Sequence, residues 1–153
     1  MRIYTKIGDI YSMDLNEKEK VFFQYIAKDK SCLNSDVIRL FKGVYEAEET
    51  PDVESIIGTG VKYYWHTSVR LGLKMGVWNR IGYSSQVGDL DIYFRREKDC
   101  GGLAKLTKPK RWVIWKLNGE DIPCEDGDIG NTNTGMVIHP GNMIKWYLGI
   151  YRD

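Results

Sequence analysis

Apolar and polar residues alternate along much of the chain, in short runs that end at Gly, Asn, Asp or Pro. Alternation with a period of two is typical of strands with one buried face, and the residues that end the runs favour turns. The pattern predicts at least six strands, at residues 7–15, 21–28, 36–45, 62–69, 76–83 and 91–95. A further strand at residues 111–117 meets Asn118-Gly119, which predicts a hairpin with a type I′ turn.

Three segments do not follow the strand pattern. The first, residues 46–58, begins with an acidic run. It ends in one short helical turn that has Pro51 near its start and Gly58 at its end. Residues 142–151 place apolar side chains at helical spacing after Asn142, a residue suited to cap a helix, although a strand there stays open. The glycines within residues 71–76 are interpreted as a link between two strands.

Composition agrees with the strand pattern. The 153 residues include ten Tyr, five Trp, four Phe and 16 Gly, a mixture that favours pleated sheet and tight turns. The tryptophans are expected to pack in or near the core rather than to form a sugar platform. We therefore predict one domain over residues 1–153, mainly β, as a twisted antiparallel sheet or a partly closed barrel with one or two short helices. A chain of this length can fold without disulfides or a metal.

The balance of charges limits which classes of partner we expect. The chain has 22 Lys and Arg against 21 Asp and Glu, so no overall field indicates nucleic acid or a membrane. No apolar run has the length of a signal-peptide core or a membrane span. Cys32, Cys100 and Cys124 are widely separated, which fits reduced thiols. We expect a cytoplasmic protein without a membrane partner.

Residue types that carry chemistry are sparse. His66 and His139 have no neighbour at the spacing of a metal site, and we interpret them as a strand histidine and a turn histidine. The glycines around Thr59 lack the lysine and hydroxyl of a phosphate loop. We expect no enzymatic activity, no cofactor and no metal site. The alternative is a small-ligand-binding or enzymatic β-barrel that uses an aromatic pocket with His66.

The acidic run before the helical turn is the candidate partner-binding surface. Its carboxylates are Glu46, Glu48, Glu49, Asp52 and Glu54. They lack the alternating oxygen ligands and central glycine of a calcium loop. One interpretation is a solvated face, and the other is a surface that imitates the charge of a nucleic acid toward an enzyme that binds one.

A basic run lies later in the chain, beside two tryptophans. It consists of Lys105, Lys108, Lys110 and Arg111, close to Trp112 and Trp115. Basic and aromatic side chains together can bind single strands of nucleic acid. The near-zero net charge and the lack of an RNA-binding motif argue against nucleic acid as the partner.

Four stretches in the first part of the chain carry a family resemblance. They are residues 8–15 (GDIYSMDL), 23–26 (FQYI), 37–45 (VIRLFKGVY) and 76–83 (GVWNRIGY). Residues 8–83 thereby resemble a family of immunity proteins from bacterial polymorphic toxin systems, which are mostly β, and nothing after about residue 93 matches. The resemblance implies a cognate protein toxin, neutralised by occlusion, and no catalytic residue. For a nuclease toxin with a basic active site, the five carboxylates are the expected contacts, and the oligomeric state is left open.

Overall fold

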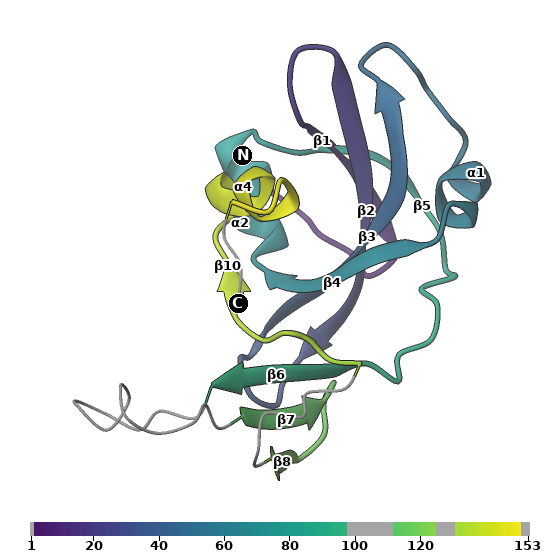
Figure 1. The fold of residues 1–153 in the computed structure, drawn as a ribbon. Coiled ribbons are helices and arrows are strands. Elements are labelled where there is room, and N and C mark those ends of the chain that lie inside the picture. Colours follow the sequence, from purple (N-terminus) through teal and green to yellow (C-terminus); the bar gives the residue numbers. More distant parts are fainter. Residues whose placement is uncertain (1, 98–111, 125–130, 151–153) are drawn as a thin grey trace.

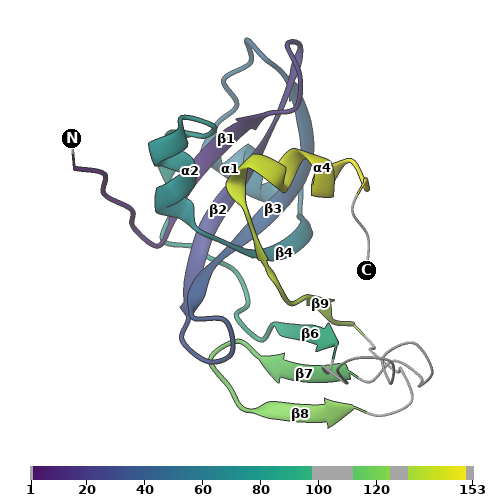
Figure 2. The ribbon, with the colours of Figure 1, turned by 90° about the vertical axis from the view of Figure 1, so that its left-hand side faces the viewer.

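The computed structural model describes residues 2–97, 112–124 and 131–150. Its larger sheet has the spatial order β10 (Val137–Ile138), β4 (Val61–Thr67), β3 (Ser35–Glu46), β2 (Glu19–Asp29), β1 (Asp9–Asp14) and β5 (Asn79–Tyr83). The smaller sheet has the order β8 (Asp121–Cys124), β7 (Trp112–Lys116), β6 (Tyr93–Glu97) and β9 (Asn133–Thr134). Figure 1 shows the smaller sheet below one end of the larger sheet, and Figure 2 shows its strands side by side. The helical elements are α1 (Val53–Gly58), α2 (Val69–Met75), the 3-10 turn η1 (Pro140–Asn142) and α4 (Met143–Tyr147).

The prediction of a mainly β fold with short helices is confirmed. Most strand pairs are antiparallel, including the opening hairpin of β1 and β2 with its charged tip. Two-residue strands add one parallel pair at an edge of each sheet, so both sheets are mixed. In the described residues, β5 and β10 lie at opposite edges of the larger sheet, which is therefore not closed into a barrel.

Buried side chains form three groups that fix where the helices lie. On one face of the larger sheet, α2 and α4 pack against a cluster that includes Tyr11 and Met13. On the other face, Ile56 of α1 packs against Ile10. The third cluster joins the two sheets and contains Phe94 and Trp115. Because both faces of the larger sheet are covered, β1 is buried on both sides, whereas simple alternation would leave one side solvated.

Helix α2 corrects the prediction of a glycine-rich link at residues 71–76. The Ser68 hydroxyl accepts a hydrogen bond from the Leu71 backbone N–H (3.3 Å), and Gly76 ends the helix with φ at +74°. These are a standard N-cap and C-cap. Gly72 lies inside the helix against the ring of Trp78, where a side chain has no room. The glycines therefore serve a helix end and a close contact instead of a turn between strands.

The hairpin of β7 and β8 is present, but its turn is not type I′. Asn118 has φ at +58°, whereas Gly119 is not in the left-handed region that type I′ also requires. The Asn118 side chain accepts a hydrogen bond from the Lys30 backbone N–H (2.6 Å) and donates one to the Lys28 carbonyl (2.9 Å). Asn118 thus ties the smaller sheet to the turn between β2 and β3.

Replacing Gly72 with alanine tests the close contact between α2 and the core. A Cβ at Gly72 would lie 2.2 Å from the Trp78 ring, which itself packs edge-on against Phe23. We expect Gly72→Ala to lower the free energy of unfolding by about 1–3 kcal/mol, as overpacking does. In Gly58→Ala, the new Cβ meets nothing within 4 Å, so the change should stay below about 1 kcal/mol. Urea denaturation measures both, and equal effects would contradict the contact.

Candidate functional site

The five predicted carboxylates lie on one continuous segment, residues 46–54, called here the acidic segment. It runs from the end of β3, at the top in Figure 1, into the first turn of α1. All five side chains are exposed, as the sequence predicts for a connection that breaks the strand pattern. Nothing in the described residues buries their charge, so the segment is available to a partner.

Two members of the acidic segment also shape the backbone. Asp52 is the N-cap of α1, and its carboxylate accepts a hydrogen bond from the Ser55 backbone N–H (2.7 Å). That hydrogen bonding holds the pKa of Asp52 below its usual value. Glu49 accepts a hydrogen bond from the backbone N–H of Glu46 (3.0 Å). Substitutions at Asp52 and Glu49 would therefore alter structure as well as charge.

The tip of the hairpin between β1 and β2 lies beside the acidic segment. The Ala47 N–H donates to the Lys18 carbonyl (2.8 Å), and the Lys20 ammonium donates to the Ala47 carbonyl (2.8 Å). A hollow of about 550 Å³ lies at this end, lined by Asn16, Glu17, Lys18, Glu19 and Glu46. Glu17 and Glu19 thus belong to the candidate site in addition to the predicted carboxylates.

Glu19 and Glu46 face each other directly in the antiparallel register of β2 and β3. Like charges at directly opposite positions destabilise a strand pair. Glu19 accepts one hydrogen bond from the Asn16 side-chain amide (3.2 Å), and no cation in the described part of the chain forms an ion pair with either carboxylate. The sequence could not reveal this pair, because it depends on a register that is interrupted twice along β2 and β3.

A second polar constellation is buried where the two sheets meet, and we call it the Asp29 cluster. One carboxylate oxygen of Asp29 accepts from Nε2 of His66 (2.8 Å) and Nε1 of Trp115 (2.9 Å). The other accepts from the Ser31 hydroxyl, the Ser31 backbone N–H (3.0 Å) and the Asn118 backbone N–H (3.3 Å). Asp29 and His66 both have 0% exposure.

The protonation states in the Asp29 cluster follow from these contacts. Burial acts to raise the pKa of Asp29, but hydrogen bonds from Ser31, Trp115 and His66 outweigh it and lower that pKa to about 2. Burial lowers the pKa of His66, against the effect of Asp29. A carboxylate can only accept, so Nε2 carries the proton of a neutral imidazole. His66 Nδ1 is buried without a hydrogen-bond partner among the described residues.

The Asp29 cluster does not have the arrangement of a catalytic triad. In a triad the histidine lies between the carboxylate and the nucleophile, whereas here Asp29 lies between His66 and Ser31. The His66 ring packs against Phe94, with centroids 4.3 Å apart. Since His66 has no exposed surface, it lines no aromatic pocket open to a ligand. His139, by contrast, is an exposed turn residue whose Nδ1 accepts from the Gly141 N–H (3.0 Å).

The tryptophans, the cysteines and the basic run lie partly within and partly outside the described residues. Trp65, Trp78 and Trp115 are buried, in agreement with a packing role, and Cys32 is a half-buried free thiol. The basic run at residues 105–111 and Cys100 lie outside the described residues. Across residues 2–97, 112–124 and 131–150, no group of three His, Cys, Asp or Glu side chains is placed to hold a metal ion.

Comparisons with protein-family models, with curated proteins and with solved structures give no match. In the part of the chain that the structure describes, no helix has the length and apolar character needed to cross a membrane.

The Asp29 cluster predicts stability that falls with acidification. An unfolded chain protonates His66 near pH 6.5, whereas the folded protein resists this because the His66 pKa is lowered, so stability should decline below that pH. Asp29 protonates near 3.8 when unfolded but near 2 when folded, so about 2 kcal/mol is present above pH 3.8 and is lost as the pH falls toward 2. Urea denaturation between pH 7 and 2 measures both steps.

Asp29→Asn tests the hydrogen bonds of the Asp29 cluster, because an amide cannot accept every hydrogen bond that the carboxylate accepts. We expect a loss of about 3 kcal/mol at pH 7 and a flatter acid slope. Asp52→Asn is the control, since asparagine caps a helix as well as aspartate does, and it should change stability by less than about 0.5 kcal/mol. Similar losses in the two variants would show that Asp29 has no special role.

Proposed function

We propose that the chain is a non-enzymatic protein-binding module, an immunity protein that neutralises a cognate bacterial toxin by occluding its active site. The observation that carries this proposal is the cross-strand pair of Glu19 and Glu46, two like charges that face each other without an ion pair in the described residues. A basic partner would compensate them. The resemblance of residues 8–83 to immunity proteins supports the same function. The buried position of His66 gives no support to a ligand-binding barrel.

The hollow between the hairpin tip and the acidic segment is suited to a basic side chain. Its lining includes three acidic residues, Glu17, Glu19 and Glu46, against the single cation Lys18. Its volume of about 550 Å³ is ample for one or two arginine or lysine side chains. Arginine binds carboxylates through two parallel hydrogen bonds, which adds geometric specificity to the charge attraction. A nuclease toxin, whose active site must bind phosphates, would supply such basic side chains.

Tight association also needs an apolar anchor, because exposed charges chiefly speed the encounter of the partners. Val44 precedes Glu46 by two residues on β3 and is 47% exposed. Residues two apart on a strand share a face, so Val44 lies on the same face as the Glu46 carboxylate. We assign it the role of an apolar contact next to the charged hollow.

Neutralising the hollow's rim and the adjoining glutamate tests the proposed contact while leaving the α1 cap intact. The variant carries four substitutions: Glu17→Gln, Glu19→Gln, Glu46→Gln and Glu48→Gln. We expect association with the purified toxin encoded beside this chain to slow about tenfold or more, with a weaker salt dependence, because electrostatic steering is screened by salt. Stability should be unchanged or higher, since a like-charge pair is removed. Stopped-flow association at several ionic strengths, with urea denaturation, provides the measurements.

The matched control neutralises four exposed carboxylates near or on the smaller sheet. These substitutions are Asp89→Asn, Asp91→Asn, Glu120→Gln and Asp121→Asn. The control has the same net charge as the test variant, so it separates a local contact from the overall field. Equal association rates for test and control would contradict the proposed site, and failure of the unmodified protein to bind the toxin would refute the immunity function.

A further inference from the structure

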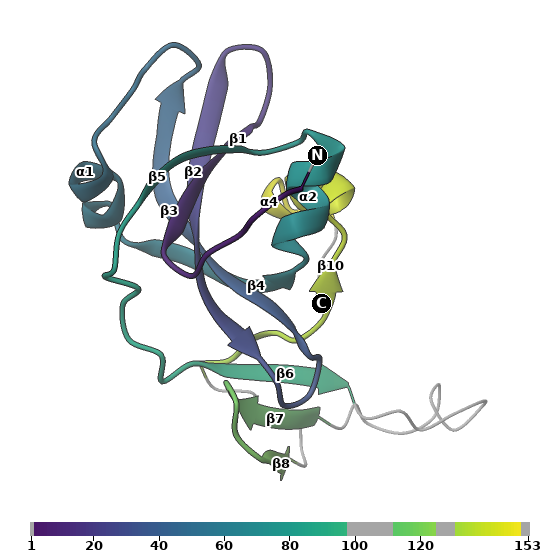
Figure 3. The same ribbon diagram turned by 180° about the vertical axis from the view of Figure 1, so that it is seen from behind.

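Positive charge gathers on a different face, formed by residues 2–7, α2 and β5. Figure 3 shows the N-terminal segment, α2 and β5 on the side toward the viewer. Residues 1–7 and 68–85 contain no carboxylate but five exposed cations, which are Arg2, Lys6, Arg70, Lys74 and Arg80. Arg80 pairs with Asp9 (2.9 Å). A near-zero net charge therefore conceals a basic face, and its helix α2 packs on the opposite face of the larger sheet from α1, where the acidic segment ends.

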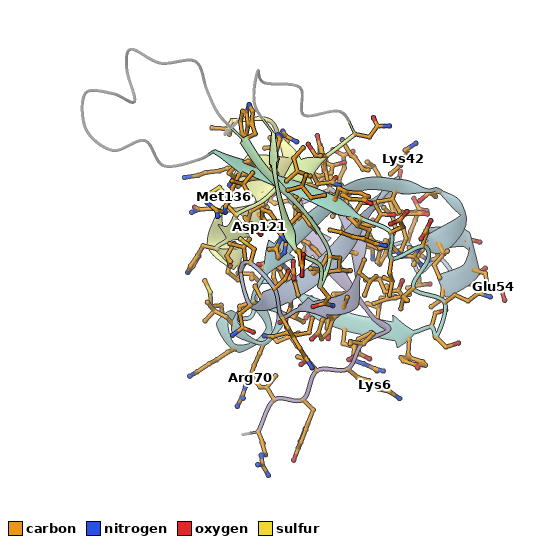
Figure 4. The ribbon with its side chains drawn as sticks, turned by 90° about the horizontal axis from the view of Figure 1, so that it is seen from below. Lys6, Lys42, Glu54, Arg70, Asp121 and Met136 are labelled. Atoms are coloured by element: carbon orange, nitrogen blue, oxygen red, sulfur yellow. The ribbon has the colours of Figure 1, made fainter. Side chains whose placement is uncertain are left out.

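A hollow of about 340 Å³ lies at this basic face. It is lined by Ile3, Ser68, Arg70, Leu71 and Lys74. Arg70 and Lys74 are four residues apart and so lie on one side of α2, while Ile3 and Leu71 add apolar surface. Neither cation has an ion-pair partner among the described residues. In Figure 4, Arg70 and Lys6 project from the same side of the molecule, away from Lys42.

Arg70 is the unfavourably placed cation of α2, since Lys74 lies in the last turn, where the helix dipole favours a cation. Like charges four residues apart destabilise a helix, and α2 has only seven residues. Arg70 also lies in the first turn, where the helix dipole disfavours a cation, and no acidic residue of that turn offsets it. A bound carboxylate between Arg70 and Lys74 would remove both penalties.

We propose that this basic face binds an extended acidic segment of a partner protein. An acidic side chain enters the hollow between Arg70 and Lys74, and an adjacent apolar side chain packs against Ile3 and Leu71. The edge of β5 favours a peptide over a nucleic acid. In the described residues β5 has no strand on its outer side, and a free strand edge offers both donors and acceptors, which a peptide backbone matches and a phosphate backbone does not.

The test uses a fluorescent peptide of alternating Glu and Leu residues, with binding followed by anisotropy. Arg70→Gln together with Lys74→Gln should weaken binding about tenfold and flatten its salt dependence. The control, Lys30→Gln together with Lys42→Gln, removes two exposed cations elsewhere and should stay within about twofold. The test variant should melt at or above the temperature of the unmodified protein, because a like-charge pair is lost. The single variant Lys74→Gln, with an intermediate affinity, keeps the test valid if the double variant unfolds.

Several outcomes would overturn the inference. They are no binding of the peptide by the unmodified protein, equal weakening in test and control, and tighter binding of a single-stranded oligonucleotide or of anionic vesicles that depends on Arg70 and Lys74. The variant neutralised at the acidic hollow should bind the peptide as the unmodified protein does. That comparison keeps this inference independent of the proposed toxin contact.

Discussion

The buried carboxylate of Asp29 is the interaction on which the arrangement of the two sheets depends. A charge without solvent contact is tolerated only when hydrogen bonds replace its water. Here the donors come from β4, from β7 and from the turns that follow β2 and β7, so satisfying one carboxylate fixes four segments at once. Apolar contacts around Phe94 and Trp115 then fill the space that the polar contacts define.

Some surface charges, unlike the buried carboxylate of Asp29, have no partner that compensates them among the described residues. Two like-charged pairs, Glu19 with Glu46 and Arg70 with Lys74, stand without a counter-ion from the described residues, although like charges at these spacings repel each other. A chain with 22 basic and 21 acidic residues had opposite charges available for such positions. The segregation of charge into an acidic end and a basic face is therefore the feature that the proposed partners would recognise.

Local patterns were sufficient to locate β1 to β7 and α1 and to indicate helical spacing near the C-terminus, since alternation, caps and helical spacing are properties of neighbouring residues. They failed where the same residue type serves two purposes. Gly72 packs against the ring of Trp78, and Gly76 ends helix α2. In the sequence, both look like glycines of a turn. The Asp29 cluster joins residues up to 89 positions apart, and the Glu19–Glu46 pair depends on two interruptions of register. No local pattern encodes either arrangement.

Strand β2 connects the buried carboxylate of Asp29 to the exposed carboxylates of the acidic end. β2 begins with Glu19 at the acidic end and closes with Asp29 in the core, and its 11 residues separate these ends by roughly 35 Å. This length is several times the screening distance of about 8 Å at physiological salt. Charge changes at the acidic end therefore leave the protonation of the Asp29 cluster untouched, so acid stability and partner steering are physically separate properties of one strand pair. A substitution that alters both at once must act by distorting β2 or β3, not through charge.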